Sequence, residues 1–158
     1  MVLTLSIVTL LGCGPSAREQ AATAYVQQME GLFAENKAIT REFINVALGL
    51  KKKDLETHEV AIRFADRVVP RATELARKVD DVQPGTEALM QVHAGIERAW
   101  QIRAEAYAQA AEAWKDGELQ SFTRAQNDNH AVSAAEERYI EAANTILAEY
   151  QLRLDLYP

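Results

Sequence analysis

Apolar residues recur along residues 25–50 at spacings that alternate between four and three, the heptad pattern of a helix packed against other helices. The residues at these positions are Tyr25, Met29, Leu32, Asn36, Ile39, Phe43, Val46 and Leu50. The chain has only 7 Gly and 4 Pro residues, and it is rich in Ala, Glu, Gln, Arg and Leu. Because this composition favours helix over sheet, we expect an all-α fold.

Three breaks containing Lys, Asp, Gly or Pro divide the chain, and the one at Asp80–Thr86 carries the strongest turn signal. The helical stretches between these breaks lie near 17–51, 54–81, 86–115 and 118–151. Long helices joined by short connections pack in opposite directions. The predicted fold is therefore an antiparallel, up-down-up-down four-helix bundle.

The second helical stretch carries a repeat of its own and contains a proline. Its expected core residues are Leu55, Ile62, Ala65, Val69, Ala72, Ala76 and Val79. A proline within a helix removes one backbone hydrogen bond and crowds the preceding turn. We therefore expect this helix to be kinked at Pro70.

The third helical stretch has two distinct faces. One is formed by alanines that permit close packing: Ala99, Ala106, Ala110 and Ala113. The other is a column of aromatic residues seven apart: His93, Trp100, Tyr107 and Trp114. Such a stripe is most often buried in the core, although it can also bind an apolar ligand or a partner helix.

The fourth stretch and the tail complete the chain. Expected core residues of the fourth stretch are Leu119, Phe122, Ala125, Val132, Ile140, Ala143, Leu147 and Tyr150. The tail at 152–158 alternates apolar and charged residues. This pattern leaves open an extended strand, a frayed helix end, or a segment docked on the bundle or on a lipid surface.

The chain begins with an apolar run, residues 1–11, that is too short to span a membrane. Gly12, Cys13 and a Gly-Pro-Ser linker follow, and no charged residue occurs before Arg18. A run of this kind is typical of the middle of a signal peptide. The alternative is a buried strand or helix end, with Cys13 as a small core residue.

The segment Leu10-Leu11-Gly12-Cys13 resembles the lipobox of bacterial lipoproteins. The resemblance implies cleavage before Cys13 and acyl chains such as palmitate on this cysteine, which anchor the protein to a membrane. Gly14, rather than Asp, implies the outer membrane with the domain facing the periplasm. The organisation predicted is a signal peptide at 1–12, a linker at 13–17, a bundle at 18–151 and a tail at 152–158.

Charge and missing motifs narrow the function classes. The net charge is −6, and an acidic domain binds polyanions poorly, so we expect no nucleic-acid partner. The single cysteine leaves no intrachain disulfide and no Cys-based metal site. Residue counting separates His58, His93 and His130 along the bundle, and phosphate-loop and nucleophile-elbow motifs are absent. We expect no metal, no cofactor and no enzymatic activity.

Polar residues interrupt the apolar seams at one height, near the middle of the bundle and level with Pro70. They are Asn36, Arg103, Asn129, Ser133 and Glu136. This mid-bundle polar layer is a candidate site for a small polar or charged ligand. Alternatively, Arg103 pairs with Glu136 and Asn36 fixes helix register, as buried polar residues do in coiled coils.

The sequence thus predicts a lipid-anchored cell-envelope protein that acts as a non-enzymatic binding or scaffold module, with another envelope protein as a candidate partner. The alternative is a small polar-ligand receptor or sensor that uses the mid-bundle polar layer. The expected topology places the lysine turn at 51–53 far from the anchoring membrane. The acidic turn at 80–81 and the C-terminus would lie near it.

Overall fold

The computed structural model describes residues 16–51, 57–115 and 119–155 of the chain. Within these ranges the regular elements are all helical, which confirms the predicted all-α class. They are α1 (Ala17–Lys51), α2 (Thr57–Arg67), α3 (Val69–Asp80), α4 (Glu87–Lys115), α5 (Leu119–Leu147) and the 3-10 helix η1 (Ala148–Tyr150). The signal peptide, Cys13 and the lysine turn at 52–53 fall outside the described residues.

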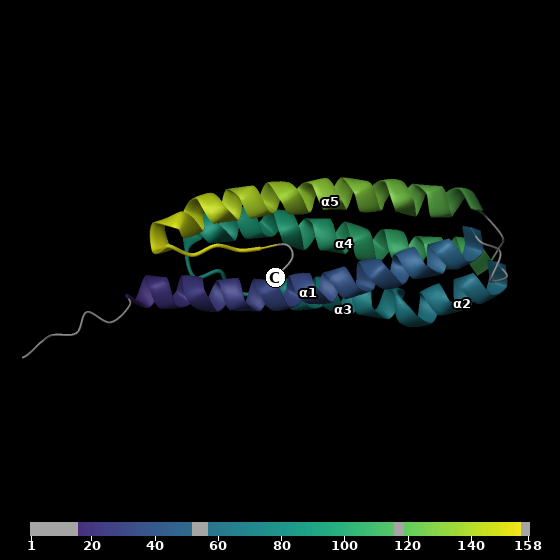
Figure 1. The fold of residues 1–158 in the computed structure, drawn as a ribbon, viewed down its shortest axis with the longest axis horizontal. Helices are drawn as coiled ribbons and strands as arrows, with labels where there is room; N and C mark the ends of the chain where they lie inside the picture. The colour runs from purple at the N-terminus through teal and green to yellow at the C-terminus, as the bar shows by residue number, and fades with distance from the viewer. Residues whose placement is uncertain (1–15, 52–56, 116–118, 156–158) are drawn as a thin grey trace, which may run out of the picture.

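The helices lie side by side along one long axis (Figure 1). α1 and α4 begin at the same end of the molecule as η1, and we call this the Thr86 end. α4 finishes at the opposite end, which we call the Lys115 end. No helix in the described ranges combines the length and the apolar character needed to cross a bilayer.

The core face of α1 follows the predicted heptad with one change. Tyr25, Met29 and Asn36 are buried as expected, and so are Ile39, Phe43 and Val46. Leu32, however, is only half-buried, and its neighbour Phe33 is 1% exposed. The later positions stay on the predicted repeat, so the change is local to this turn, where the ring of Phe33 packs against Trp100 and Tyr139.

The second predicted helix is divided into α2 and α3 at Val68, two residues before Pro70. Backbone bonds continue across the division: the Val68 amide donates to the Phe64 carbonyl, and the Ala72 amide donates to the Val68 carbonyl, each at 3.0 Å. Proline has no amide hydrogen, so the backbone hydrogen bond at Pro70 is missing in any case. The interruption beside it therefore removes few additional hydrogen bonds. The interruption expected at Pro70 is therefore present, with the break itself at Val68.

The core register predicted for the second helix is wrong at Ile62. Its side chain is 47% exposed, whereas Ala61, Phe64 and Val68 are all at most 1% exposed. In α2 the buried face is rotated by about one residue from the predicted one, whereas Ala72, Ala76 and Val79 of α3 are buried as predicted. The alanines of α2 are small enough to lie on the predicted face or on the observed one. The aromatic ring of Phe64 has more apolar area to bury than they do, so it decides which face is turned to the core.

The aromatic column of α4 belongs to the core. His93 and Trp100 are each 1% exposed, and Tyr107 is fully buried. Tyr107 stacks on Phe43 with ring centroids 5.0 Å apart and meets the edge of Phe64 at 5.4 Å. The core interpretation of the column is thus confirmed for these three residues; the Trp114 side chain falls outside the described set.

The connection from α3 to α4 depends on Gly85. This residue has φ of +77°, and a Cβ added there would lie 2.8 Å from the Cβ of Ala21 on α1. Only glycine adopts this backbone conformation without steric cost. Thr86 then caps α4, because its side-chain oxygen accepts a hydrogen bond from the Leu89 amide at 3.2 Å.

The C-terminal segment reverses direction after η1 and docks on the bundle. Gln151 is left-handed (φ 58°), its amide donates to the Ala148 carbonyl, and the Leu152 amide donates to the Leu147 carbonyl. These two bonds form the Schellman motif that ends many helices. Residues 152–155 then run back along the bundle between α5 and α1 (Figure 1), and Leu154 is fully buried. Docking on the bundle is therefore the outcome for this part of the tail.

Candidate functional site

The structure brings the predicted mid-bundle polar residues into one network. One terminal nitrogen of Arg103, Nη1, donates to Glu136 Oε1 and to Asn36 Oδ1, each at 2.6 Å. The Nε of Arg103 donates to Asn129 Oδ1 at 3.0 Å. Asn36 in turn donates from Nδ2 to Glu136 Oε1 at 2.9 Å. Arg103 on α4 therefore joins α1 to α5, and we call this set of residues the Arg103 network.

Glu136 is the common acceptor of the network, and its two oxygens are used very differently. Oε1 accepts from Asn36, from Arg103 and also from Trp100 Nε1 at 2.7 Å. Oε2 accepts only a long contact of 3.4 Å from Arg103 Nη2 among the described residues. A carboxylate offers about four lone-pair positions. Oε1 is thus fully occupied, whereas Oε2 retains capacity to accept.

Asn129 and Ser133 extend the network along α5. Asn129 Oδ1 accepts a second hydrogen bond, from the Tyr107 hydroxyl at 2.9 Å. Burial raises the pKa of Tyr107 to about 12. Ser133 donates to the Asn129 backbone carbonyl at 3.0 Å, so it satisfies its own helix rather than reaching Arg103. Trp100 and Tyr107, which belong to the aromatic column of α4, thus also contribute polar atoms to this layer.

Burial makes the network unusual for a charged group. Arg103 is 2% exposed and Glu136 is 7% exposed. Charged side chains at this depth require partners, because desolvation costs several kcal/mol for each ion. The amide oxygens of Asn36 and Asn129, which accept from Arg103, and the indole of Trp100, which donates to Glu136, supply those partners. The pairing of Arg103 with Glu136, which is one of the two predicted alternatives, is therefore present.

A cavity of about 250 Å³ opens beside the network, between α1 and α5. Its floor includes Asn36, Arg103 and Glu136, and its α1 wall includes Lys37 and Arg41. Thr40 and Ser133 add hydroxyl groups, and Phe33 adds an apolar side. We call it the α1–α5 pocket. Because a buried ion pair lies at its base, the pocket combines a fixed charged floor with an opening to solvent.

A second buried polar cluster, which the sequence reasoning missed, lies nearer the Thr86 end. The Tyr25 hydroxyl is 2.5 Å from the Tyr139 hydroxyl and 3.0 Å from His93 Nδ1. His93 Nε2 lies 3.0 Å from the Val79 carbonyl and 3.3 Å from Glu97. We call this the Tyr25 cluster. His93 was recognised as a member of the aromatic column, but nothing local in the sequence names Tyr25 and Tyr139 as its neighbours.

The Tyr25 cluster is a continuous chain of hydrogen bonds. A carbonyl can only accept, so His93 Nε2 donates to Val79. The other ring nitrogen, Nδ1, is hydrogen-bonded to the Tyr25 hydroxyl, which in turn is hydrogen-bonded to the Tyr139 hydroxyl. Burial raises the pKa of Tyr25 to about 12 and that of Tyr139 further still. The three side chains of the cluster therefore satisfy one another's polar groups inside the core.

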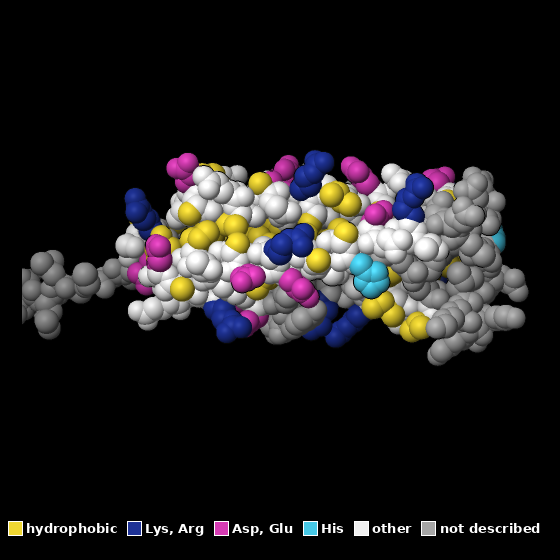
Figure 2. All heavy atoms as spheres, turned by 90° about the horizontal axis from the view of Figure 1, so that it is seen from above, with side chains coloured by type: hydrophobic (Ala, Val, Ile, Leu, Met, Phe, Trp, Pro, Cys, Tyr) yellow, Lys and Arg dark blue, Asp and Glu magenta, His cyan; other side chains and the backbone are white. Residues whose placement is uncertain are grey.

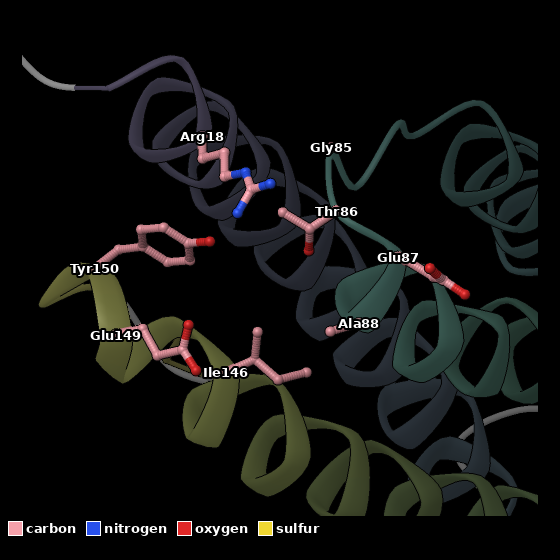
Figure 3. A pocket seen from close by; sticks show the side chains of 8 residues that line it. All are labelled: Arg18, Gly85, Thr86, Glu87, Ala88, Ile146, Glu149 and Tyr150. Atoms are coloured by element: carbon pink, nitrogen blue, oxygen red, sulfur yellow. The ribbon is translucent and has the colours of Figure 1, made fainter.

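A wider cavity, of about 420 Å³, lies at the Thr86 end (Figure 3). Arg18, Glu149 and Tyr150 turn their polar groups toward this space, whereas Glu87 points away from it. Arg18, Glu149 and Glu87 are all exposed. This cavity therefore has no buried charged group, in contrast to the α1–α5 pocket.

The remaining histidines and the surface charges form no further site in the described parts of the chain. His58 and His130 are exposed, and His93 is buried in the Tyr25 cluster. No three His, Cys, Asp or Glu side chains among the described residues are arranged to hold a metal ion. On the face seen from the α5 side, basic and acidic side chains are interspersed (Figure 2).

Comparison with known proteins adds no relative. The chain matches no protein-family model, no curated protein and no solved structure at a significant level.

Proposed function

We propose that this chain is a lipid-anchored, non-enzymatic binding module of the bacterial cell envelope, and that the α1–α5 pocket is its binding site. The anchor is supported by the lipobox-like segment ending in Cys13. Membrane attachment through this lipid would leave the helical domain in the periplasm, at the outer membrane. The ligand-binding role is supported by one observation: an open cavity of about 250 Å³ with the buried Arg103–Glu136 pair as its floor.

The proposed topology is an antiparallel, up-down-up-down bundle in which α2 and α3 act as one helix. In support, Tyr25 contacts Tyr139, whereas Asn36, farther along α1, contacts Glu136, which lies earlier in α5. Asn36 is roughly 30 Å along α1 from Ala17. A lipid on Cys13 would therefore hold the Thr86 end near the membrane and leave the pocket well clear of it.

The charged floor supports a binding role because stability alone does not require it. Replacing a buried ion pair by well-packed apolar residues is often neutral or stabilising. A pair that is held by additional hydrogen bonds and borders an open cavity is instead suited to orienting a polar ligand. The non-enzymatic assignment follows from the sequence, which offers no recognisable nucleophile, metal or phosphate motif.

The anchor is tested by growing a bacterial host with radioactive palmitate and comparing the full-length chain with Cys13→Ser. We expect label on the natural chain and none on the variant. Ser16→Ala, a substitution of similar size three residues away, is the matched control and should label normally. Equal labelling of the natural chain and Cys13→Ser would refute the anchor.

The binding site is tested by the double variant Arg103→Met/Glu136→Leu, which removes both charges together. We expect this variant to remain folded, with a melting temperature near or above that of the natural chain. A panel of amino acids, organic acids, sugars and nucleosides is then screened by thermal shift. At least one compound should stabilise the natural chain and have no effect on the double variant. Identical responses of the two proteins would refute the site.

Exposed apolar residues favour a scaffold role as the second candidate. Ile44 and Leu48 are 46% and 44% exposed, and their spacing of four places them on one face of α1. A photocrosslinking amino acid at Leu48 would then capture a defined envelope protein in cells. The same label at Arg98, an exposed position on α4, is the control. Equal crosslinking from both positions would argue against this role.

A further inference from the structure

Thr40 presents an unused hydroxyl on the α1 side of the α1–α5 pocket. In Thr23, Thr73 and Thr145 the side-chain hydroxyl donates to the carbonyl four residues earlier in the same helix. Thr40 is half-buried and lines the pocket, and its hydroxyl forms no such bond, nor one to any other described residue. This hydroxyl can therefore donate to and accept from a group inside the pocket.

The α5 side and the floor of the pocket also keep hydrogen-bonding capacity. The one hydroxyl hydrogen of Ser133 is used by the Asn129 carbonyl, so the Ser133 oxygen is left to accept. Glu136 Oε2 has only the 3.4 Å contact from Arg103 Nη2 within the described residues. Nη2 carries two hydrogens and makes no other hydrogen bond in the described part of the chain, so it can donate again. An acceptor and a donor thus lie next to each other at the base of the pocket.

The charged groups around the pocket already have partners or solvent. Arg103 and Glu136 neutralise each other at 2.6 Å. Lys37 has an interaction of its own, and Arg41 is exposed. An exposed charge is hydrated and screened by salt. A charged ligand would lose part of its hydration without gaining a fixed counter-ion, so the pocket favours a neutral ligand.

The remaining capacity suits hydroxyl groups on a small molecule. A hydroxyl both donates and accepts, so it matches a site in which acceptors and donors lie side by side. Several hydroxyls are needed, because the unused groups belong to three helices, α1, α4 and α5. The cavity volume of about 250 Å³ lies below the roughly 300–1,000 Å³ that is usual for drug-sized ligands. The ligand should therefore be short.

Building on the proposed function, we propose that the α1–α5 pocket binds a small, neutral compound with several hydroxyl groups, of the polyol or monosaccharide class. One hydroxyl donates to Glu136 Oε2 and accepts from Arg103 Nη2. Neighbouring hydroxyls reach Thr40 on α1 and Ser133 on α5. The Arg103 network positions the first contact, because its other hydrogen bonds hold the guanidinium and the carboxylate in place.

The ligand class is tested by isothermal titration calorimetry on the full-length chain, with erythritol, D-ribose and D-glucose as neutral probes. The butanediol with hydroxyls only at its ends has the carbon chain of erythritol without the inner hydroxyls. Meso-tartrate and putrescine have the same chain length but carry negative and positive charge. We expect at least one neutral probe to bind at least about tenfold more tightly than all of these controls, because the controls lose hydrogen bonds or must desolvate a charge. The proposal is overturned if no neutral probe exceeds the controls by that factor.

The contact with α1 is tested by Thr40→Val, which keeps the shape of the side chain and removes its hydroxyl. We expect this variant to bind the best neutral probe about three- to tenfold more weakly, the effect of one neutral hydrogen bond. Thr145→Val removes a hydroxyl at an exposed position of α5 outside the pocket lining, and it should bind normally. Equal affinities in the two variants would contradict the contact at Thr40.

The double variant Arg103→Met/Glu136→Leu separates this inference from the proposed function. If no neutral probe binds, but another compound stabilises the natural chain and not the double variant, only this inference fails and the binding site stands. If a neutral probe binds the double variant as tightly as the natural chain, both fail, because the charged floor is then not part of the site.

Discussion

The seam between α1 and α5 is built differently in its two halves. Toward the Thr86 end, it contains the Tyr25 cluster, and the tail packs along it with Leu154 fully buried. Toward the Lys115 end, it contains the charged Arg103 network, and the α1–α5 pocket stays open above it. Both halves satisfy their buried polar groups. Only the open half combines that satisfaction with charge and access, which supports the proposed binding site there.

The covered half of the seam is closed by two specific hydrogen bonds between Asn144 and the tail, and not by apolar packing alone. Asn144 on α5 donates to the Leu154 carbonyl at 3.0 Å and accepts from the Leu154 amide at 2.7 Å. One amide side chain thus pairs with both backbone groups of the tail residue, as a neighbouring strand would. Asn144 lies roughly 8 Å along α5 from Tyr139 of the Tyr25 cluster. The tail therefore shields this half, and the open half has no such cover among the described residues.

The largest difference between the halves should appear when one member of the charged pair is removed. Glu136→Leu leaves Arg103 buried without its counter-ion, and we expect a loss of about 3–5 kcal/mol in the free energy of unfolding. Chemical denaturation measures it. The double variant Arg103→Met/Glu136→Leu should recover most of this loss. A single variant within about 1 kcal/mol of the natural chain would show that the pair is not a buried charge network.

Alkaline pH should weaken both halves in the same window. The pKa values of Tyr25 and Tyr107 are raised from 10.0 to about 12 by burial. Tyrosinate therefore forms more easily in the unfolded chain, so stability is complete below pH 10 and is lost as the pH rises toward 12. Each tyrosine should contribute on the order of 2–3 kcal/mol to this loss.

The alkaline loss is followed by denaturation at several pH values, together with the ultraviolet absorbance of tyrosinate. Tyr25→Phe should reduce the loss from the covered half, and Tyr107→Phe should reduce the loss from the open half. If neither substitution changes the pH dependence, burial of these hydroxyls is not its cause.

The tail offers the next test, because it exists only over the covered half. Leu154→Ala removes a fully buried side chain and should cost roughly 2 kcal/mol of unfolding free energy. Leu152→Ala, at a half-buried position in the same segment, is the control and should cost less. Faster hydrogen exchange at Asn144 and its neighbours should accompany Leu154→Ala alone. Equal effects of the two substitutions would show that Leu154 is not the main contact of the tail.

The smallest expected effect is a gain at the reversal that starts the tail. Gln151 adopts a left-handed conformation that glycine adopts without steric cost. Gln151→Gly should therefore stabilise the chain by up to about 1 kcal/mol. Thermal melting measures this, with Gln151→Ala as the control that keeps a Cβ and should give no gain. A loss of stability in Gln151→Gly would indicate that the glutamine side chain itself holds the tail.

The mid-bundle layer was predictable from the sequence, whereas the Tyr25 cluster was not. Asn36, Arg103 and Glu136 are polar residues at apolar seam positions, so counting residues along helices placed them at one height. Tyr25, Tyr139 and His93 instead occupy positions where aromatic rings suit the core. Their hydroxyl and imidazole groups meet only because three helices converge there. The polar residues stood out against an apolar pattern, and the aromatic ones matched it.

The sequence by itself determined that the chain is helical and where each helix begins and ends to within a few residues, because those limits depend on local signals such as Thr86, Gly85 and the heptad of α1. Tertiary structure alone decided the register of α2, the return of the tail and the closure of half of the α1–α5 seam. These features depend on competition among distant groups for buried area and hydrogen bonds: Phe64 displaces Ile62 from the core, and Asn144 binds the backbone of Leu154. Such competition leaves no periodic trace along the chain.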